Sequence, residues 1–273
     1  MKLAPHLHRL GNDVVACYLV DTDEGITLID AGLPGHWRDL RRELRSLGRS
    51  VDDIRGLVLT HGDSDHLGFA ERLRSEHGVP VFVHAADAVR ARTGQKPKVA
   101  VGPVRLGPAL GFLGYSIRKN GLRTRHVGEV TEIGDGDVLD LPGSPVIVGM
   151  PGHSPGSVAV HVPLADAVFV GDALTTRHVL TGREGPQPAP LHRRPGPGTR
   201  LPRPDRPAAG VLGASRTRRP LAHLTGPGQR DGPRGWRRRV TEHCRPAAAW
   251  RLRRPLGVLR RGLPPTFAQP TNG

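Results

Sequence analysis

The chain has 273 residues, of which 40 are Lys or Arg and 25 are Asp or Glu, so its formal net charge is +15 at pH 7. The excess of basic charge suggests a nucleic-acid partner, but residues 1–190 carry 21 basic and 22 acidic residues, and the whole excess lies in residues 191–273. Two cysteines, Cys17 and Cys244, are too few for a disulfide scaffold or a cysteine-rich metal site.

Neither a membrane segment nor a secretion signal is evident in the chain. No stretch approaches the ~20 apolar residues that a membrane-spanning helix needs. The segment Met1–His6 lacks the apolar core of a signal peptide. We therefore expect a soluble protein of the cytoplasm with no membrane partner.

Residues 1–190 predict a compact α/β domain that begins with paired strands. Two β-rich runs, 14–20 and 25–30, flank a short turn of Asp and Gly. Apolar residues recur at helical spacing over 37–47, and Gly48 follows at the place where a helix C-terminus favours positive φ. An amphipathic helix is therefore expected after the second strand.

The next segments twice repeat the order strand, polar loop and helix. A buried strand is predicted over 56–60, and the polar loop 61–66 leads into a helix that starts near Leu67. A simpler second unit has a strand at 79–83 and a helix at 85–92.

The remainder of this part contains a weaker region and then more strands. Residues 94–125 are rich in Gly, Pro, Lys and Arg with a patch of Leu, Phe and Tyr, and we expect an inserted cap or loop there. Strand-like runs return at 138–141, 146–148, 157–162 and 167–170. Strands with interspersed helices predict layered sheets with helices outside.

The loop after the strand at 56–60 concentrates possible metal ligands. His61, Asp63, Asp65 and His66 place two imidazoles and two carboxylates within six residues. This density of nitrogen and oxygen donors is typical of a divalent metal site. The alternative is a polar loop in which an Asp caps the following helix and the histidines are solvated.

Two later segments favour the metal site over that alternative. His153 lies in the turn Pro151–Ser157, whose Gly and Pro residues fix the backbone and leave the imidazole free to point outward. Asp172 follows an apolar strand-like run through Gly171. Each signal is weak alone, but together and in this order they predict a metal site.

With these segments the sequence resembles the metallo-β-lactamase superfamily. The resemblance covers about residues 7–190 and rests on four motifs: Leu28–Gly32, Thr60–Gly68, Pro151–Ser157 and Gly171–Asp172. It implies an α/β fold, the four-layered αβ/βα sandwich, with a binuclear metal centre along one sheet edge.

For the first metal ion, the resemblance implies His61, Asp63 and His153 as ligands. The family motif usually reads HxHxDH, so Asp63 stands where a second histidine is expected. A carboxylate makes the site harder and more anionic, which favours Mn or Fe relative to Zn. Zinc is the first expectation for the two divalent ions, with Mn or Fe as alternatives.

For the second ion, the resemblance implies Asp65 and His66 as ligands, with Asp172 bridging the two ions and Asp30 supporting the site. Asp65 is also the expected catalytic residue, because it can accept a proton. The remaining histidines before residue 190 match no motif and are expected to have surface or packing roles. They are His6, His8, His36, His77, His84, His126, His161 and His178.

These expectations describe a metal-dependent hydrolase. Two cations lower the pKa of a bound water toward ~7, and the resulting metal-bound hydroxide attacks a carbonyl or phosphoryl centre. The substrate would be an ester, lactone, thioester, amide or phosphoester of a small molecule, since the fold does not select one. Segment 94–125 favours an anionic substrate with an apolar part, unless it is only a solvated basic cap.

The last 83 residues differ from everything before them. They contain 19 Arg and no Lys, Ile, Met or Tyr, a composition that a GC-rich gene yields when it is read out of phase. They also lack the final Gly-His-Gly turn that the family expects. We therefore predict that residues 191–273 are a frameshifted tail rich in Arg, Pro and Gly, with a genuine disordered basic tail as the alternative.

Two other functions stay open for such a chain. Without the last ligand and the outer helices, it would be a catalytically impaired family member that binds metal weakly. If the tail is genuine, it would bind nucleic acid through phosphate contacts, with an affinity that falls steeply with salt. Nucleic acid is the less favoured partner, because the tail has only three aromatic residues, Trp236, Trp250 and Phe267.

Overall fold

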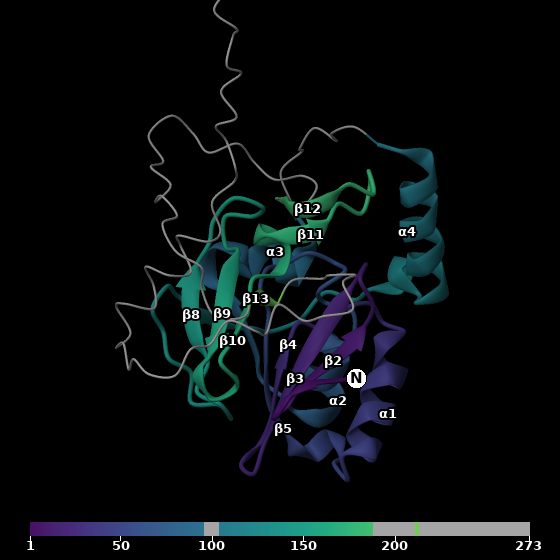
Figure 1. Cartoon of the computed structure of the whole chain (residues 1–273). Helices are drawn as coiled ribbons and strands as arrows, with labels where there is room; N and C mark the ends of the chain where they lie inside the picture. Colours follow the sequence, from purple (N-terminus) through teal and green to yellow (C-terminus); the bar gives the residue numbers. More distant parts are fainter. Residues whose placement is uncertain (96–103, 188–210, 213–273) are drawn as a thin grey trace, which may run out of the picture.

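The computed structural model describes residues 1–95, 104–187 and 211–212, which contain two facing β-sheets (Figure 1). The first sheet has seven strands in chain order: β1 Lys2–Ala4, β2 Leu7–Gly11, β3 Ala16–Thr22, β4 Gly25–Ile29, β5 Ile54–Val58, β6 Val81–His84 and β7 Thr131–Ile133. Strands β1 to β4 pair antiparallel, whereas β4 to β7 run parallel. The parallel half therefore places the carboxyl ends of several strands at one edge.

The second sheet has the strand order β13-β10-β9-β8. Its strands are β8 Val146–Gly149, β9 Val158–Val162, β10 Ala167–Phe169 and β13 Val211–Leu212. A separate hairpin pairs β11 Thr175–Arg177 with β12 Glu184–Gln187. The predictions for the tail at 191–273 lie outside the described residues, apart from β13, which pairs parallel with β10.

Three helices cover the outer face of the first sheet: α1 His36–Ser46, α2 Ala70–His77 and α3 Ala88–Thr93. Trp37, Leu40 and Leu44 share one face of α1 and pack against the sheet, as their helical spacing predicts. Five single turns of 3-10 helix complete the elements: η1 Val51–Asp53, η2 Ala85–Asp87, η3 Gly121–Arg123, η4 Pro163–Ala165 and η5 Gly171–Ala173. Within the described ranges, every helix is too short or too polar to cross a bilayer.

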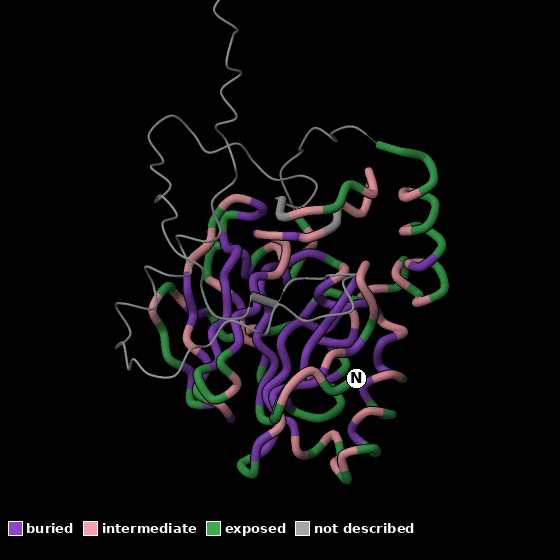
Figure 2. Tube along the Cα trace, in the orientation of Figure 1, coloured by how far each residue is buried: buried purple, intermediate pink, exposed green. Residues whose placement is uncertain are grey.

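A second apolar core fills the space between the two sheets. In β3, Cys17 and Leu19 face the helices, whereas Tyr18 and Val20 face the second sheet. The ring of Tyr18 meets that of Phe169 in β10, with centroids 4.8 Å apart. Figure 2 shows the strands of both sheets as largely buried. The layers thus follow in the order helices, first sheet, second sheet. A further apolar cluster lies on the far face of the second sheet, and none of the described helices contributes to it.

The two sheets meet at one edge, next to Thr60. Its carbonyl, just after β5, accepts a hydrogen bond of 2.9 Å from the backbone N–H of Val158 at the start of β9. Gly171, after β10, has φ +48° and lies so close that a Cβ would be 2.3 Å from the Thr60 Oγ1 atom, so only glycine fits. The segments that follow β4, β5 and β10 and precede β9 therefore converge here.

The expected strand at 138–141 is wrong. Val138 forms only an isolated bridge with Val146, and a turn closed by the hydrogen bond from Ser144 N to Leu141 O follows at once. The two leucines of this segment are buried, so their spacing reflects burial and not strand pairing. Strands β1, β2 and β7 and the β11–β12 hairpin were not predicted, because runs this short show no clear alternation.

The region expected to be an inserted cap contains α4 Leu106–Arg118, at the edge of the molecule in Figure 1. Its inner side places Phe112 and Tyr115 against Val15 and Leu33. Its outer side exposes four apolar residues at helical spacing: Leu106, Leu110, Leu113 and Ile117. A cap role for this segment stays a prediction.

His36 connects α1 to α4 from a fully buried position. Its Nδ1 atom accepts a hydrogen bond of 2.9 Å from the Leu33 N–H, so Nε2 carries the proton and donates to the Tyr115 hydroxyl at 2.7 Å. Burial, together with the charge of Lys119, lowers the pKa of His36 from 6.5 to about 4. The folded chain therefore holds a neutral imidazole here.

This low pKa makes the stability of the fold depend on pH. Between pH 6.5 and 4, the unfolded chain binds a proton at His36 that the folded chain excludes, so the free energy of unfolding falls by up to about 3 kcal/mol as the pH is lowered. Denaturant unfolding at several pH values measures this slope. A His36→Asn variant should show a shallower slope over the same range, and equal slopes in the two proteins would contradict the prediction.

Candidate metal centre

The loop after β5 and the turn before β9 bring a first group of donors together. His61, Asp63 and His153 are buried, and one ligand atom from each lies within 4.8 Å of the others. The His153 Nε2 atom is 3.1 Å from Asp63 Oδ2, and His61 Nε2 is 3.8 Å from the same oxygen. These are the residues that the resemblance assigned to the first ion.

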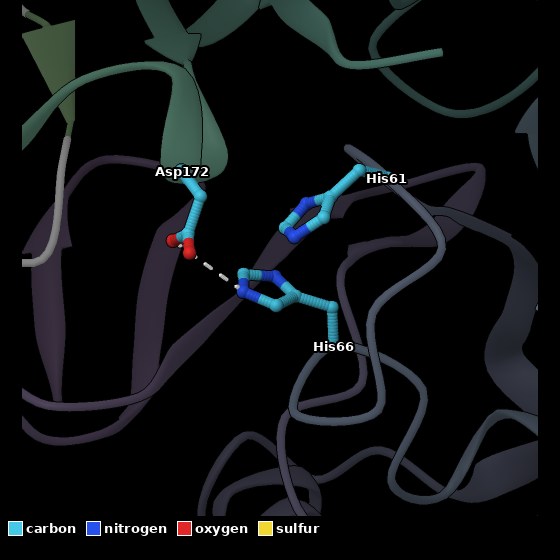
Figure 3. Close-up of side chains that lie close together, drawn as sticks. All are labelled: His61, His66 and Asp172. Atoms are coloured by element: carbon cyan, nitrogen blue, oxygen red, sulfur yellow. Dashed lines mark ion pairs between the residues drawn. The ribbon is translucent and has the colours of Figure 1, made fainter. Parts of the chain in front are cut away.

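A second group shares His61 and adds His66 and Asp172, whose side chains point toward one another in Figure 3. The Nε2 atom of His66 is 3.6 Å from Asp172 Oδ1. The other oxygen of Asp172 is 3.7 Å from His153 Nε2, in the first group. The carboxylate of Asp172 thus belongs to the second group and also lies near His153 of the first.

Asp30 orients the imidazole of His66. It follows β4 with a left-handed backbone, at φ +59°, and is buried. Its carboxylate accepts hydrogen bonds from Thr60 N, Thr60 Oγ1 and His66 Nδ1, each of 2.8 Å. Because His66 uses Nδ1 for this bond, its Nε2 atom is left to face Asp172.

Thr60 sets the tautomer of His61. Its hydroxyl donates to Asp30, so it can only accept from the Nδ1–H of His61, 3.1 Å away. His61 Nε2 therefore carries a lone pair, and this buried atom has no hydrogen-bond partner in the described part of the chain. A buried acceptor without a partner is costly, and a divalent ion would satisfy it. The donor set therefore fits a metal site.

The pKa values of the two histidines of the second group are shifted in opposite directions. Burial, together with His66, lowers the pKa of His61 well below its usual range, so that imidazole is neutral. Burial also acts to lower the pKa of His66, but Asp30 and Asp172 raise it well above its usual range. Burial would raise the pKa of Asp172, yet the nearby imidazole of His66, 3.6 Å away, lowers it. A metal ion at His66 Nε2 would require a neutral imidazole, so its binding would release any proton held there.

Asp65 lies outside both donor groups. Burial raises the pKa of its carboxyl, as do the carboxylates of Asp172 and Asp63, while His66 opposes the shift. Every other ligand expected from the sequence belongs to one of the groups, and Asp30 lies beside them. The roles of Asp65 as second-ion ligand and proton acceptor stay predictions.

Asp87, which sequence reasoning missed, joins the two loops of the first group. It is fully buried, and its Oδ2 atom accepts hydrogen bonds from Gly62 N at 2.9 Å and Ser154 Oγ at 2.6 Å, while Oδ1 accepts one from Gly156 N at 2.9 Å. An Asp directly before a helix is typical of an N-cap, but this one makes no capping bond to α3. The local pattern therefore carries no signal for its actual role.

The sequence model of the metallo-beta-lactamase superfamily matches residues 10–222, and the chain belongs to this family. Two Bacillus subtilis proteins are similar to it: uncharacterized protein YobT, 28% identical over 60% of this chain and 63% of its own length, and probable metallo-hydrolase YflN, 24% identical over 64% and 66%. The chain thus spans less than two-thirds of either relative. A Cronobacter sakazakii metallo-beta-lactamase structure aligns at TM-score 0.48 and 24% identity, over 63% of this chain and 64% of that one.

Replacing Asp87 tests its role in holding the two loops. In Asp87→Asn one oxygen becomes an NH2 group that faces N–H or O–H donors, so the free energy of unfolding should fall by about 2 kcal/mol or more. Bound metal per chain should fall as well, because the loop of His61 is no longer tied to the turn of His153. Thermal unfolding and elemental analysis measure the two effects. Asp137→Asn, in an exposed turn, is the matched control, and an equal response of both variants would refute the role.

Proposed function

We propose that this protein is a metal-dependent hydrolase with two divalent ions in its centre. The observation that carries the proposal is the pair of His and Asp groups that share His61, whose buried Nε2 atom has no hydrogen-bond partner within the described residues. The family and the printed name of YflN, a probable metallo-hydrolase, support the same reaction class. Zinc suits the imidazole nitrogens, and the carboxylates make Mn or Fe the alternatives.

When bound, the ions would supply a water of lowered pKa and a Lewis acid for the substrate oxygen. His61, Asp63 and His153 would hold one ion, and His66 would hold the other with Asp172 between them. Asp30 keeps the Nε2 atom of His66 directed into the site through its hydrogen bond to Nδ1.

Asp65 is proposed to take up the proton that the reaction releases, as the sequence predicts. The position of its carboxyl among the charges of His66, Asp172 and Asp63 supports this role. Burial raises the pKa of this carboxyl, which makes it a better proton acceptor than an ordinary aspartate. The residue is thus a general base in the proposal, in addition to its expected role as a ligand.

The substrate is proposed to be a small ester, lactone, thioester, amide or phosphoester in the cytoplasm. A cavity of about 30 Å³ beside His66 and Asp172 is also lined by Val14. Val14 also lines a larger groove of about 590 Å³, which runs along α4 and has Phe112 and Arg118 in its walls. Its volume is in the range of small-molecule sites, and its residues suit an apolar group next to an anionic one.

Metal removal tests the reaction class. The full chain, supplied with Zn²⁺ or Mn²⁺, should hold up to two ions and hydrolyse at least one member of a panel of lactone, thioester, β-lactam and phosphodiester substrates. Dialysis against a chelator should abolish the activity, and adding the ion back should restore it. Hydrolysis that persists after elemental analysis finds no metal would contradict the proposal.

Replacing Asp65 tests the proton acceptor. In Asp65→Ala, kcat for any substrate found should fall by roughly 10²-fold or more, because general-base assistance is lost. Steady-state kinetics measure this, with metal content determined on the same samples. Asp140→Ala replaces an exposed carboxylate that lies outside both donor groups, and it should keep the activity of the unaltered chain. Unchanged kcat in Asp65→Ala would rule out this mechanism.

A further inference from the structure

Arg90, on α3, contacts one of the candidate metal ligands. Its Nε atom donates to Asp63 Oδ1 at 2.7 Å, and its Nη2 atom lies 2.5 Å from the same oxygen. Only 11% of the Arg90 side chain and 8% of the Asp63 side chain are exposed. The other carboxylate oxygen, Oδ2, faces His61 and His153. Asp63 thus offers one oxygen to a cation of the chain and the other to the donor group.

Close packing keeps Arg90 at this position. Gly62 lies against α3, where a Cβ would be 3.0–3.1 Å from Ala91 N, Arg90 Cβ and Asp87 O. Asp87, almost one helical turn before Arg90, accepts the hydrogen bond from Gly62 N. The start of α3 is therefore held against the backbone next to Asp63, which keeps the base of the Arg90 side chain beside that residue.

The contact changes the charge that the first donor group presents. The sequence alone predicts a more anionic site, because Asp63 replaces a neutral imidazole. A guanidinium stays protonated at all ordinary pH values, and at hydrogen-bond distance it offsets the carboxylate charge. Together, Asp63 and Arg90 carry no net charge, like an imidazole at this place.

We propose that Arg90 is a positioning residue that makes Asp63 act as a charge-compensated ligand and thereby sets the metal preference of the centre. The inference rests on the proposed metal centre but not on hydrolysis. It requires that residues 63 and 90 be coupled: a neutral side chain at 63 is compatible with tight metal binding only when the side chain at 90 is also neutral.

Calorimetric titration of the metal-free full chain with Zn²⁺ tests the coupling. Asp63→His leaves the Arg90 cation beside the ion without its counter-charge, so the affinity should fall ~10-fold or more. Asp63→His with Arg90→Gln removes the cation and should recover most of that loss. Asp63→His with Arg90→Lys keeps a cation and should stay weak. An Asp63→His chain that binds as tightly as the unaltered one, or equal affinities of the Gln and Lys double variants, would overturn the proposal.

A second titration keeps Asp63 in place, so it does not depend on the folding of Asp63→His. Arg90→Gln leaves the carboxylate uncompensated, and its affinity for Mn²⁺ relative to Zn²⁺ should rise ~3-fold or more, whereas Arg90→Lys should leave the ratio unchanged. Equal ratios in the two variants would overturn the proposal. Circular dichroism of each metal-free chain verifies folding. A protein that binds Zn²⁺ with this coupling but hydrolyses nothing contradicts only the proposed function.

Discussion

A carboxylate that is buried away from water must either gain hydrogen bonds or lose its charge. Asp87 meets this requirement with hydrogen bonds that join the two halves of the centre. Its oxygens accept from Gly62 on one loop and from Ser154 and Gly156 on the other. These bonds hold the loops in register without using any of the donor atoms. The distances between the candidate ligands therefore depend on a residue that binds no ion itself.

The same requirement explains the arrangement of charges around the donors. Asp30 is satisfied by Thr60 and His66, and in return it fixes the nitrogen that His66 presents. Asp63 is satisfied by Arg90 on one side. Both carboxylates are thus paired with side chains of the fold, and these pairs orient the candidate ligands.

The donors could be located in the sequence because each lies where a recognisable strand ends or begins. His61 follows the run that becomes β5, Asp172 follows β10, and His153 lies in a Gly and Pro turn before β9. Asp87 and Arg90 could not be located from the sequence, because their hydrogen-bond partners lie 25 to 69 residues away along the chain. A helical pattern indicates only which face of the helix is apolar. The strand predicted at 138–141 is wrong for a similar reason, because buried leucines in a turn show the same alternation as a strand.

The separation of these partners along the chain also shapes how the protein folds. Asp63 meets His153 across 90 residues, and Ser154 meets Asp87 across 67. Closing such long loops costs entropy before any contact repays it, and parallel pairing of β4 to β7 adds to the delay. We therefore expect the donors to come together late in folding. An ion in the proposed centre would then bind the finished structure and slow its unfolding.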